Sequence, residues 1–181
     1  MARMLAMLAV LMAAAPVQAA DRPSKGEAEV HYTVTPKQLE AVFKKAGFKT
    51  KLITHKVEEG RKPTYTIQAT DKTPFYMSAD LRVCDQDEGP KGCLGILLVA
   101  WMELDPGDLA VARRTAEEYN REYYVGRAYV SKDGKGLIFE NYVMVDGGVT
   151  EKNLESNLDN FLGGYDALVE EYREQAKAIE T

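Results

Sequence analysis

The chain has 181 residues, and its 23 Lys and Arg stand against 28 Asp and Glu, which gives a formal net charge of −5. This acidic balance argues against nucleic acid or an anionic membrane surface as the partner. The length suits one domain with a hydrophobic core of its own.

The first residues have the three-part layout of a secretory signal peptide, with a cation at Arg3, an apolar run over 4–15 and small residues after it. The apolar run is too short to cross a bilayer, which takes about 20 residues. The alternative is a buried N-terminal helix. The expected organisation is a signal peptide over residues 1–19, cleaved between Ala19 and Ala20, a flexible lead-in over 20–33, and one domain over 34–181. We expect the mature chain to be periplasmic or secreted, without stable membrane insertion.

The domain opens with a helix, whose start is marked by the sequence V-T-P-K-Q-L at 34–39. Thr35 and Gln38 can form a capping box, and Pro36 occupies the favoured first helical position. Gly47 offers a left-handed stop at the other end. Strands are expected next, because apolar and polar residues alternate over 65–69 and again over 75–83.

Residues 94–102 form an apolar run, so both faces of the expected strand are apolar, which is typical of a central strand. Residues 105–108 then open a second helix, and a hairpin follows with strands over 127–130 and 137–145 around Asp133-Gly134. A third helix begins after Thr150 and runs to Ile179, and we expect Gly163-Gly164 to bend or loosen it. The order helix, four strands, helix, two strands, helix predicts an α+β domain: a largely antiparallel sheet flanked by three helices that cover one side.

Both cysteines, Cys84 and Cys93, flank a polar turn between two expected strands. A redox dithiol usually places its cysteines two residues apart, and a zinc site needs about four ligands, which His31 and His55 are not spaced to complete. Asp85 and its neighbours match a calcium loop poorly. We therefore expect a disulfide, as an exported protein meets oxidising conditions.

The sequence contains no nucleophile elbow, zinc-protease, P-loop or dinucleotide-binding motif, so we expect no catalytic, metal or cofactor residues. Aromatic side chains instead gather around the second helix and the hairpin, as in an interaction patch. They are Tyr119, Tyr123, Tyr124, Tyr129 and Tyr142, with Trp101 and Arg127 beside them. The alternative is a core whose phenol tips reach solvent. The candidate patch is Trp101, Tyr119, Tyr123, Arg127 and Tyr129.

The segment from 119 to 158 resembles the YbjN domain family, whose members are described as bacterial sensory transduction regulators. The matching features are Tyr119-Asn120, R-A-Y at 127–129, the turn at Asp133-Gly134, and G-G-V-T followed by N-L over 147–154. The likeness covers roughly residues 34–172. It implies an α+β fold like that of type III secretion chaperones, which present an apolar surface to a partner or a second copy, and it carries no catalytic residue.

We expect from these features a non-enzymatic, periplasmic protein-interaction or chaperone-like regulatory module without a cofactor. It would bind another protein, or itself as a homodimer, through its sheet and aromatic patch. The alternative is a periplasmic carrier of a small ligand or lipid, with a pocket beneath the third helix.

Overall fold

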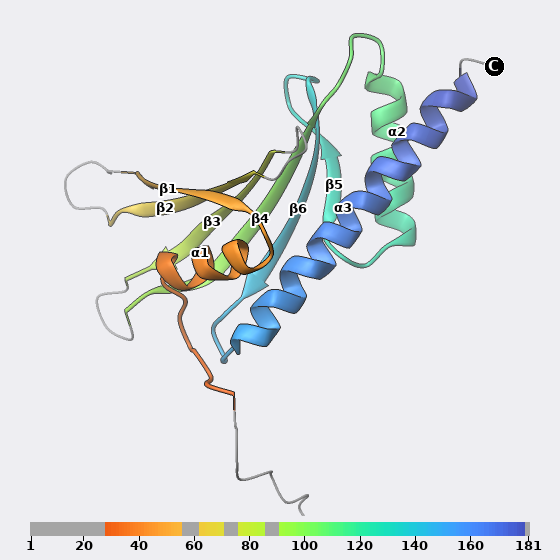
Figure 1. The fold of residues 1–181 in the computed structure, drawn as a ribbon. Coiled ribbons are helices and arrows are strands. Elements are labelled where there is room, and N and C mark those ends of the chain that lie inside the picture. Colours follow the sequence, from red (N-terminus) through yellow and green to blue (C-terminus); the bar gives the residue numbers. More distant parts are fainter. Residues whose placement is uncertain (1–27, 56–61, 71–75, 86–90, 180–181) are drawn as a thin grey trace, which may run out of the picture.

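The computed structural model describes residues 28–55, 62–70, 76–85 and 91–179. The expected signal peptide and its cleavage site at Ala19 and Ala20 lie outside these residues. The elements are α1 (Pro36–Lys45), β1 (Lys49–His55), β2 (Thr64–Thr70), β3 (Tyr76–Cys84), β4 (Cys93–Glu103), α2 (Leu109–Glu122), β5 (Arg127–Val130), β6 (Gly136–Met144) and α3 (Glu151–Ile179) (Figure 1). The expected order of helices and strands is confirmed.

The six strands form one antiparallel sheet in the order β1-β2-β3-β4-β6-β5, which confirms the expected α+β class. The first four strands are neighbours in sequence, but β6 pairs with β4 after α2 and β5 have intervened. β4 is therefore central, as its length and apolar pattern predicted.

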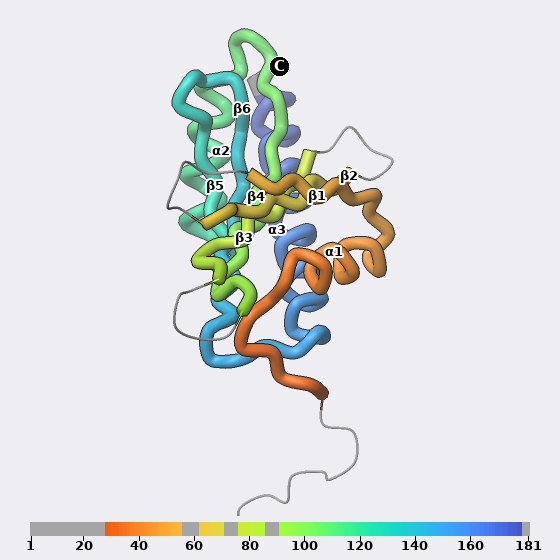
Figure 2. Tube along the Cα trace, turned by 90° about the vertical axis from the view of Figure 1, so that its left-hand side faces the viewer, coloured from red at the N-terminus to blue at the C-terminus, as the bar shows by residue number. Residues whose placement is uncertain are grey.

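The helices lie against one face of this sheet. Along β4, Ile96, Leu98 and Ala100 point to this face and are buried. Ile96 and Leu98 meet side chains of α1 and α3, and both helices lie on the same side of the strands in Figure 2. On β6, the Phe139 ring packs against Tyr119 of α2 and Phe161 of α3. All three helices therefore share one hydrophobic layer with the sheet.

Local signals at the helix ends explain where the helices begin and stop. The Thr35 hydroxyl accepts from the Gln38 backbone amide while the Gln38 side chain accepts from the Thr35 amide, so the expected capping box is present. Thr150 and Asn153 repeat the arrangement at the start of α3. Gly47 follows α1 with a φ of 92°, a left-handed conformation that a glycine adopts without strain.

Gly163-Gly164, where a bend or loosening was expected, does not interrupt α3, which is one unbroken helix from Glu151 to Ile179. Gly164 has a packing role instead. A Cβ at this position would lie 2.8 Å from Cζ of Phe139 and 2.9 Å from the hydroxyl of Tyr119. The glycine lets α3 approach β6 and α2 closely, whereas a Cβ at Gly163 would have nothing within 4 Å.

The segment before α1 is tied to the domain. His31 exchanges backbone hydrogen bonds with Val149 at 2.7 and 2.8 Å, and Val34 does the same with Cys93 at 3.0 and 2.9 Å. Within the expected flexible lead-in, His31 is thus paired with the fold, and the Thr33 hydroxyl donates to the backbone oxygen of Lys91 at 2.7 Å. The two cysteines face each other across β3 and β4, with their sulfurs bonded at 2.10 Å.

Candidate interaction surface

The face of the sheet opposite the helices is not covered by any described element. Strand residues alternate between the two faces, so Trp101 of β4 and Tyr142 of β6 point away from the helices. They are 38% and 48% exposed, and Met144 beside them is 67% exposed. We call this surface the open-face patch; it consists of Tyr76, Leu97, Val99, Trp101, Tyr129, Ile138, Tyr142 and Met144.

The strand register lines up part of this patch in one row. Tyr76 of β3 lies opposite Trp101 of β4, Trp101 lies opposite Ile138 of β6, and Ile138 lies opposite Tyr129 of β5. Neighbouring strands are about 4.8 Å apart, so the row spans roughly 14 Å between its outer Cα atoms. Four strands thus contribute one continuous apolar band.

Two glycines allow aromatic rings to lie on the strands. A Cβ at Gly136 would fall 1.5 Å from Nε1 of Trp101, and a Cβ at Gly95 would fall 1.8 Å from the hydroxyl oxygen of Tyr142. Each ring therefore occupies the space that a side chain on the neighbouring strand would take. Because aromatic rings cover these backbone positions, the patch presents flat, closely packed rings.

Charged groups beside the band are paired with each other. Arg127 donates from Nε to Oε1 of Glu140 at 2.7 Å, and the Tyr129 hydroxyl donates to Oε2 of the same carboxylate at 2.7 Å. The guanidinium carbon of Arg127 also lies 5.4 Å from the centre of the Tyr129 ring, at cation–π distance. Burial, together with the bond to Glu140, raises the pKa of Tyr129 to about 12. These contacts hold Tyr129 in place at the edge of the band.

The residues predicted from sequence as a patch do not form one surface. Trp101, Arg127 and Tyr129 do lie together on the open face. Tyr119 does not: it is only 1% exposed, and its hydroxyl donates to the backbone oxygen of Val125 at 2.9 Å. The Tyr123 ring stacks on Tyr119 at 4.6 Å, on the helix side. Tyr119 is a core residue, and burial raises its pKa to about 12.

Sequence reasoning left Tyr76 and Met144 out, whereas it gathered Tyr142 with the same aromatic side chains. Alternation along β6 places Tyr142 on the same face as Ile138, so the signal was present for part of the band. The burial of Tyr119 could also have been predicted, because this residue shares one helical stripe with Ala112 and Ala116, which are both buried.

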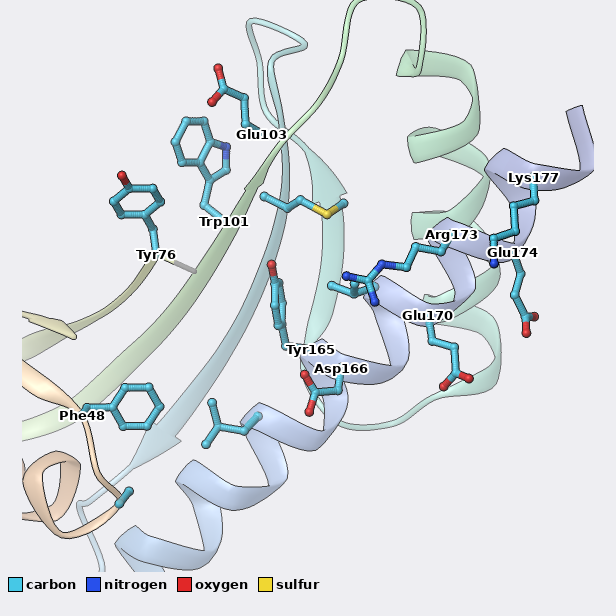
Figure 3. A pocket seen from close by; sticks show the side chains of 14 residues that line it. Phe48, Tyr76, Trp101, Glu103, Tyr165, Asp166, Glu170, Arg173, Glu174 and Lys177 are labelled. Carbon is cyan, nitrogen blue, oxygen red and sulfur yellow. The ribbon is translucent and has the colours of Figure 1, made fainter. Parts of the chain in front are cut away.

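A cleft lies on the other side, between the sheet and the second half of α3 (Figure 3). This cleft has a volume of about 1240 Å³ and is open to solvent. Phe48, Met102, Leu162, Tyr165 and Val169 provide its apolar lining, and charged side chains of α3 form its rim. Burial raises the pKa of Tyr165 to about 12, with the nearby Asp166 carboxylate adding to the effect.

Among the described residues, no three His, Cys, Asp or Glu side chains come close enough to hold a metal ion. None of the helices in that part of the chain is long and apolar enough to cross a membrane. The exposed groups of the open-face patch are aromatic or aliphatic, and the charged groups beside it are ion-paired; such a surface is suited to binding.

Comparison with known proteins assigns the chain to a family. The family model YbjN, described as "Putative bacterial sensory transduction regulator", matches residues 78–174. This stretch runs from β3 through most of α3 and contains every residue of the open-face patch except Tyr76. No curated protein and no solved structure matches the chain.

Proposed function

Because the chain belongs to the YbjN family of bacterial sensory transduction regulators, we propose that it is a non-enzymatic regulatory module that binds a protein partner, or a second copy of itself, through its open-face patch. The family description supports a regulatory role. The chemistry of the patch supports binding to a protein, because aromatic residues and Arg are enriched at such interfaces.

The observation that carries this proposal is that both faces of β4 are apolar but the helices cover only one of them. The strand is apolar on both faces, a pattern usual for strands that are covered on both sides. Here the helices cover only one face, while Leu97 and Val99 on the other are partly exposed and Trp101 is exposed. Exposed apolar bands of this kind mark interaction sites in folded proteins. A partner laid on the sheet would supply the missing layer.

The same proposal places the mature protein in the periplasm or outside the cell. Two features support export: the signal-peptide layout of the first 19 residues and the bonded pair Cys84 and Cys93, since disulfides persist in oxidising compartments. Cell fractionation followed by mass mapping under non-reducing conditions tests this. We expect a chain that starts at Ala20 with the two cysteine peptides linked; unprocessed cytosolic protein with free thiols would refute export.

The binding surface is tested by a pair of variants compared with a matched control. Tyr142→Glu with Met144→Glu places two charges on the open-face patch, and Tyr124→Glu places a charge on an aromatic that is 99% exposed outside it. We expect the double variant to lose the wild-type partner in affinity purification, or the wild-type dimer in sedimentation, while Tyr124→Glu keeps both. If wild-type protein is a monomer with no specific partner, or if both variants behave alike, the proposal fails.

A further inference from the structure

The cleft beside α3 is a separate surface from most of the open-face patch, with which it shares only Tyr76 and Trp101 at its border. Its long wall is the second half of α3. Leu162, Tyr165 and Val169 follow one another at spacings of three and four residues, and Arg173 and Lys177 continue the row (Figure 3). Such spacing forms a continuous stripe along one side of a helix.

The flank of this half of α3 next to the stripe is already fixed to α2 and to Asp108, the residue before it. Arg114 donates from Nε to Oε1 of the buried Gln175 at 2.9 Å, and the Tyr172 hydroxyl donates to Oδ2 of Asp108 at 2.5 Å. Burial and this carboxylate raise the pKa of Tyr172. Because α2 holds one flank of α3, the adjoining stripe stays directed into the cleft.

The rim of the cleft carries an unbalanced row of carboxylates. Asp166, Glu170 and Glu174 are spaced four residues apart, an arrangement of like charges that destabilises a helix on its own. Within the described residues none of the three forms an ion pair, whereas Glu151 and Glu155 in the first half of the same helix both contact Lys45. Together with Glu103, these carboxylates outnumber the two cations of the lining, Arg173 and Lys177, so the cleft as a whole is complementary to a positively charged ligand.

The dimensions of the cleft favour a helix as that ligand. From Leu162 to Lys177 the wall of α3 extends over about 22 Å, the length of four helical turns. At about 1240 Å³, the open cleft exceeds the roughly 300 to 1,000 Å³ usual for small-molecule pockets. An amphipathic helix lying along α3 would bury its apolar face against the lining and place its flanking side chains over the acidic rim.

We propose that this cleft binds a basic amphipathic helix of a partner protein, with the apolar face of that helix on Met102, Leu162 and Val169 and its Lys or Arg side chains on Asp166, Glu170 and Glu174. The inference adds a second binding surface to the proposed function. It assigns each part of the cleft a role: the lining supplies apolar contact, and the carboxylate row selects for positive charge.

The probe for this site is a pair of synthetic helical peptides of about 16 residues, matching four to five turns. Both carry Leu at helical spacing, and the remaining positions are Lys in one peptide and Glu in the other. Fluorescence anisotropy with full-length protein measures their affinities, and circular dichroism reports helix formation on binding. We expect the Lys peptide to bind as a helix and the Glu peptide to bind at least about tenfold more weakly, since several charge pairs change sign.

Matched charge variants locate the site. The test protein carries Asp166→Asn, Glu170→Gln and Glu174→Gln; the control carries Glu117→Gln, Asp146→Asn and Asp159→Asn, three exposed carboxylates away from the cleft. Both sets remove three negative charges and replace only exposed side chains, so both proteins should fold. We expect the test set to weaken binding of the Lys peptide about tenfold and the control set to leave it unchanged.

Several results would overturn the inference. Equal loss in both variant proteins would mean that only net charge attracts the peptide, and equal binding of the two peptides would deny the role of the rim. No binding of the Lys peptide would also contradict it.

Native mass spectrometry adds two further outcomes that would contradict the inference. A small molecule retained by wild-type protein but lost in Val169→Lys would identify a carrier. A dimer abolished by that change would mean that a second copy fills the cleft. None of these results affects the open-face patch, which Tyr142→Glu with Met144→Glu tests separately.

Discussion

At the scale of single residues, two glycines decide how the open-face patch is built. Gly95 and Gly136 lie on central strands, where a glycine normally weakens the sheet because it offers no side chain for packing. Here each leaves room for an aromatic ring from the neighbouring strand, Tyr142 in one case and Trp101 in the other. A flat apolar surface results without bulky side chains beneath the rings.

Substitution of Gly136 by Ala should therefore displace Trp101. The new Cβ would fall 1.5 Å from Nε1, so the ring must leave the strand and meet more water. Trp101 is the only tryptophan in the chain, so its fluorescence reports the change directly. We expect emission at longer wavelength, stronger quenching by acrylamide, and a loss of about 1 to 3 kcal/mol in unfolding free energy. Gly163→Ala is the control and should leave the spectrum unchanged; an unaltered spectrum in Gly136→Ala would contradict the described packing.

The buried tyrosines lead to a second prediction at the residue scale, on how the stability of the fold depends on pH. Burial raises the pKa of Tyr119 and of Tyr165 from the ordinary 10 to about 12. The folded state therefore holds these protons more tightly than the unfolded state does. The resulting stabilisation is complete below pH 10 and is lost as the pH rises from 10 towards 12.

Urea unfolding followed by circular dichroism at several pH values between about 9 and 11.5 checks this. Tyr119→Phe should cost about 1 kcal/mol at neutral pH, because the hydrogen bond to Val125 is lost, and its stability should then fall less steeply above pH 10. Tyr124→Phe, on an exposed side chain, should follow the wild-type curve. Parallel curves for wild type and Tyr119→Phe would contradict the assignment.

At the scale of elements, the sequence was a good guide to helices and strands and a poorer one to their contacts. Thr35 with Gln38 and the apolar alternation of the strands act locally, so they could be read from neighbouring residues. Gly163-Gly164 could not, because the reason for Gly164 lies on β6 and α2, far away in the chain. A glycine pair inside a helical pattern indicates either a bend or a close approach, and only the packed structure tells which.

The two glycines of α3 give a matched pair of opposite predictions. Gly163→Ala should stabilise the protein by about 0.5 to 1 kcal/mol, because Ala favours the helix and its Cβ meets nothing within 4 Å. Gly164→Ala should destabilise it by about 1 to 3 kcal/mol, since the Cβ would press on Phe139 and Tyr119. Denaturant midpoints of the two variants measure the difference. Equal stabilisation by both would mean that the helix has room to move away from β6.

At the scale of the whole molecule, the layered architecture determines where the candidate binding surface lies. The helices fill one side of the sheet, and the open face keeps an apolar band that spans β3, β4, β6 and β5. Trp101, Arg127 and Tyr129 were predicted to lie together, and they do. Tyr142 was gathered with them as well, whereas Tyr76 joins them only through the register between β3 and β4, which no local pattern encodes. The inclusion of Tyr119 was wrong because helix α2 turns that face inwards.

The central claim is that the open face meets a protein partner in the cell, and site-specific photo-crosslinking tests it most directly. A photoreactive phenylalanine analogue replaces Tyr142 on the open-face patch or, in a control strain, Tyr124 outside it. The account predicts a discrete crosslinked species from position 142, to another protein or to a second copy, that disappears when Met144 is changed to Glu and is absent from position 124. Absence of any species from position 142, or the same species from both positions, would contradict it.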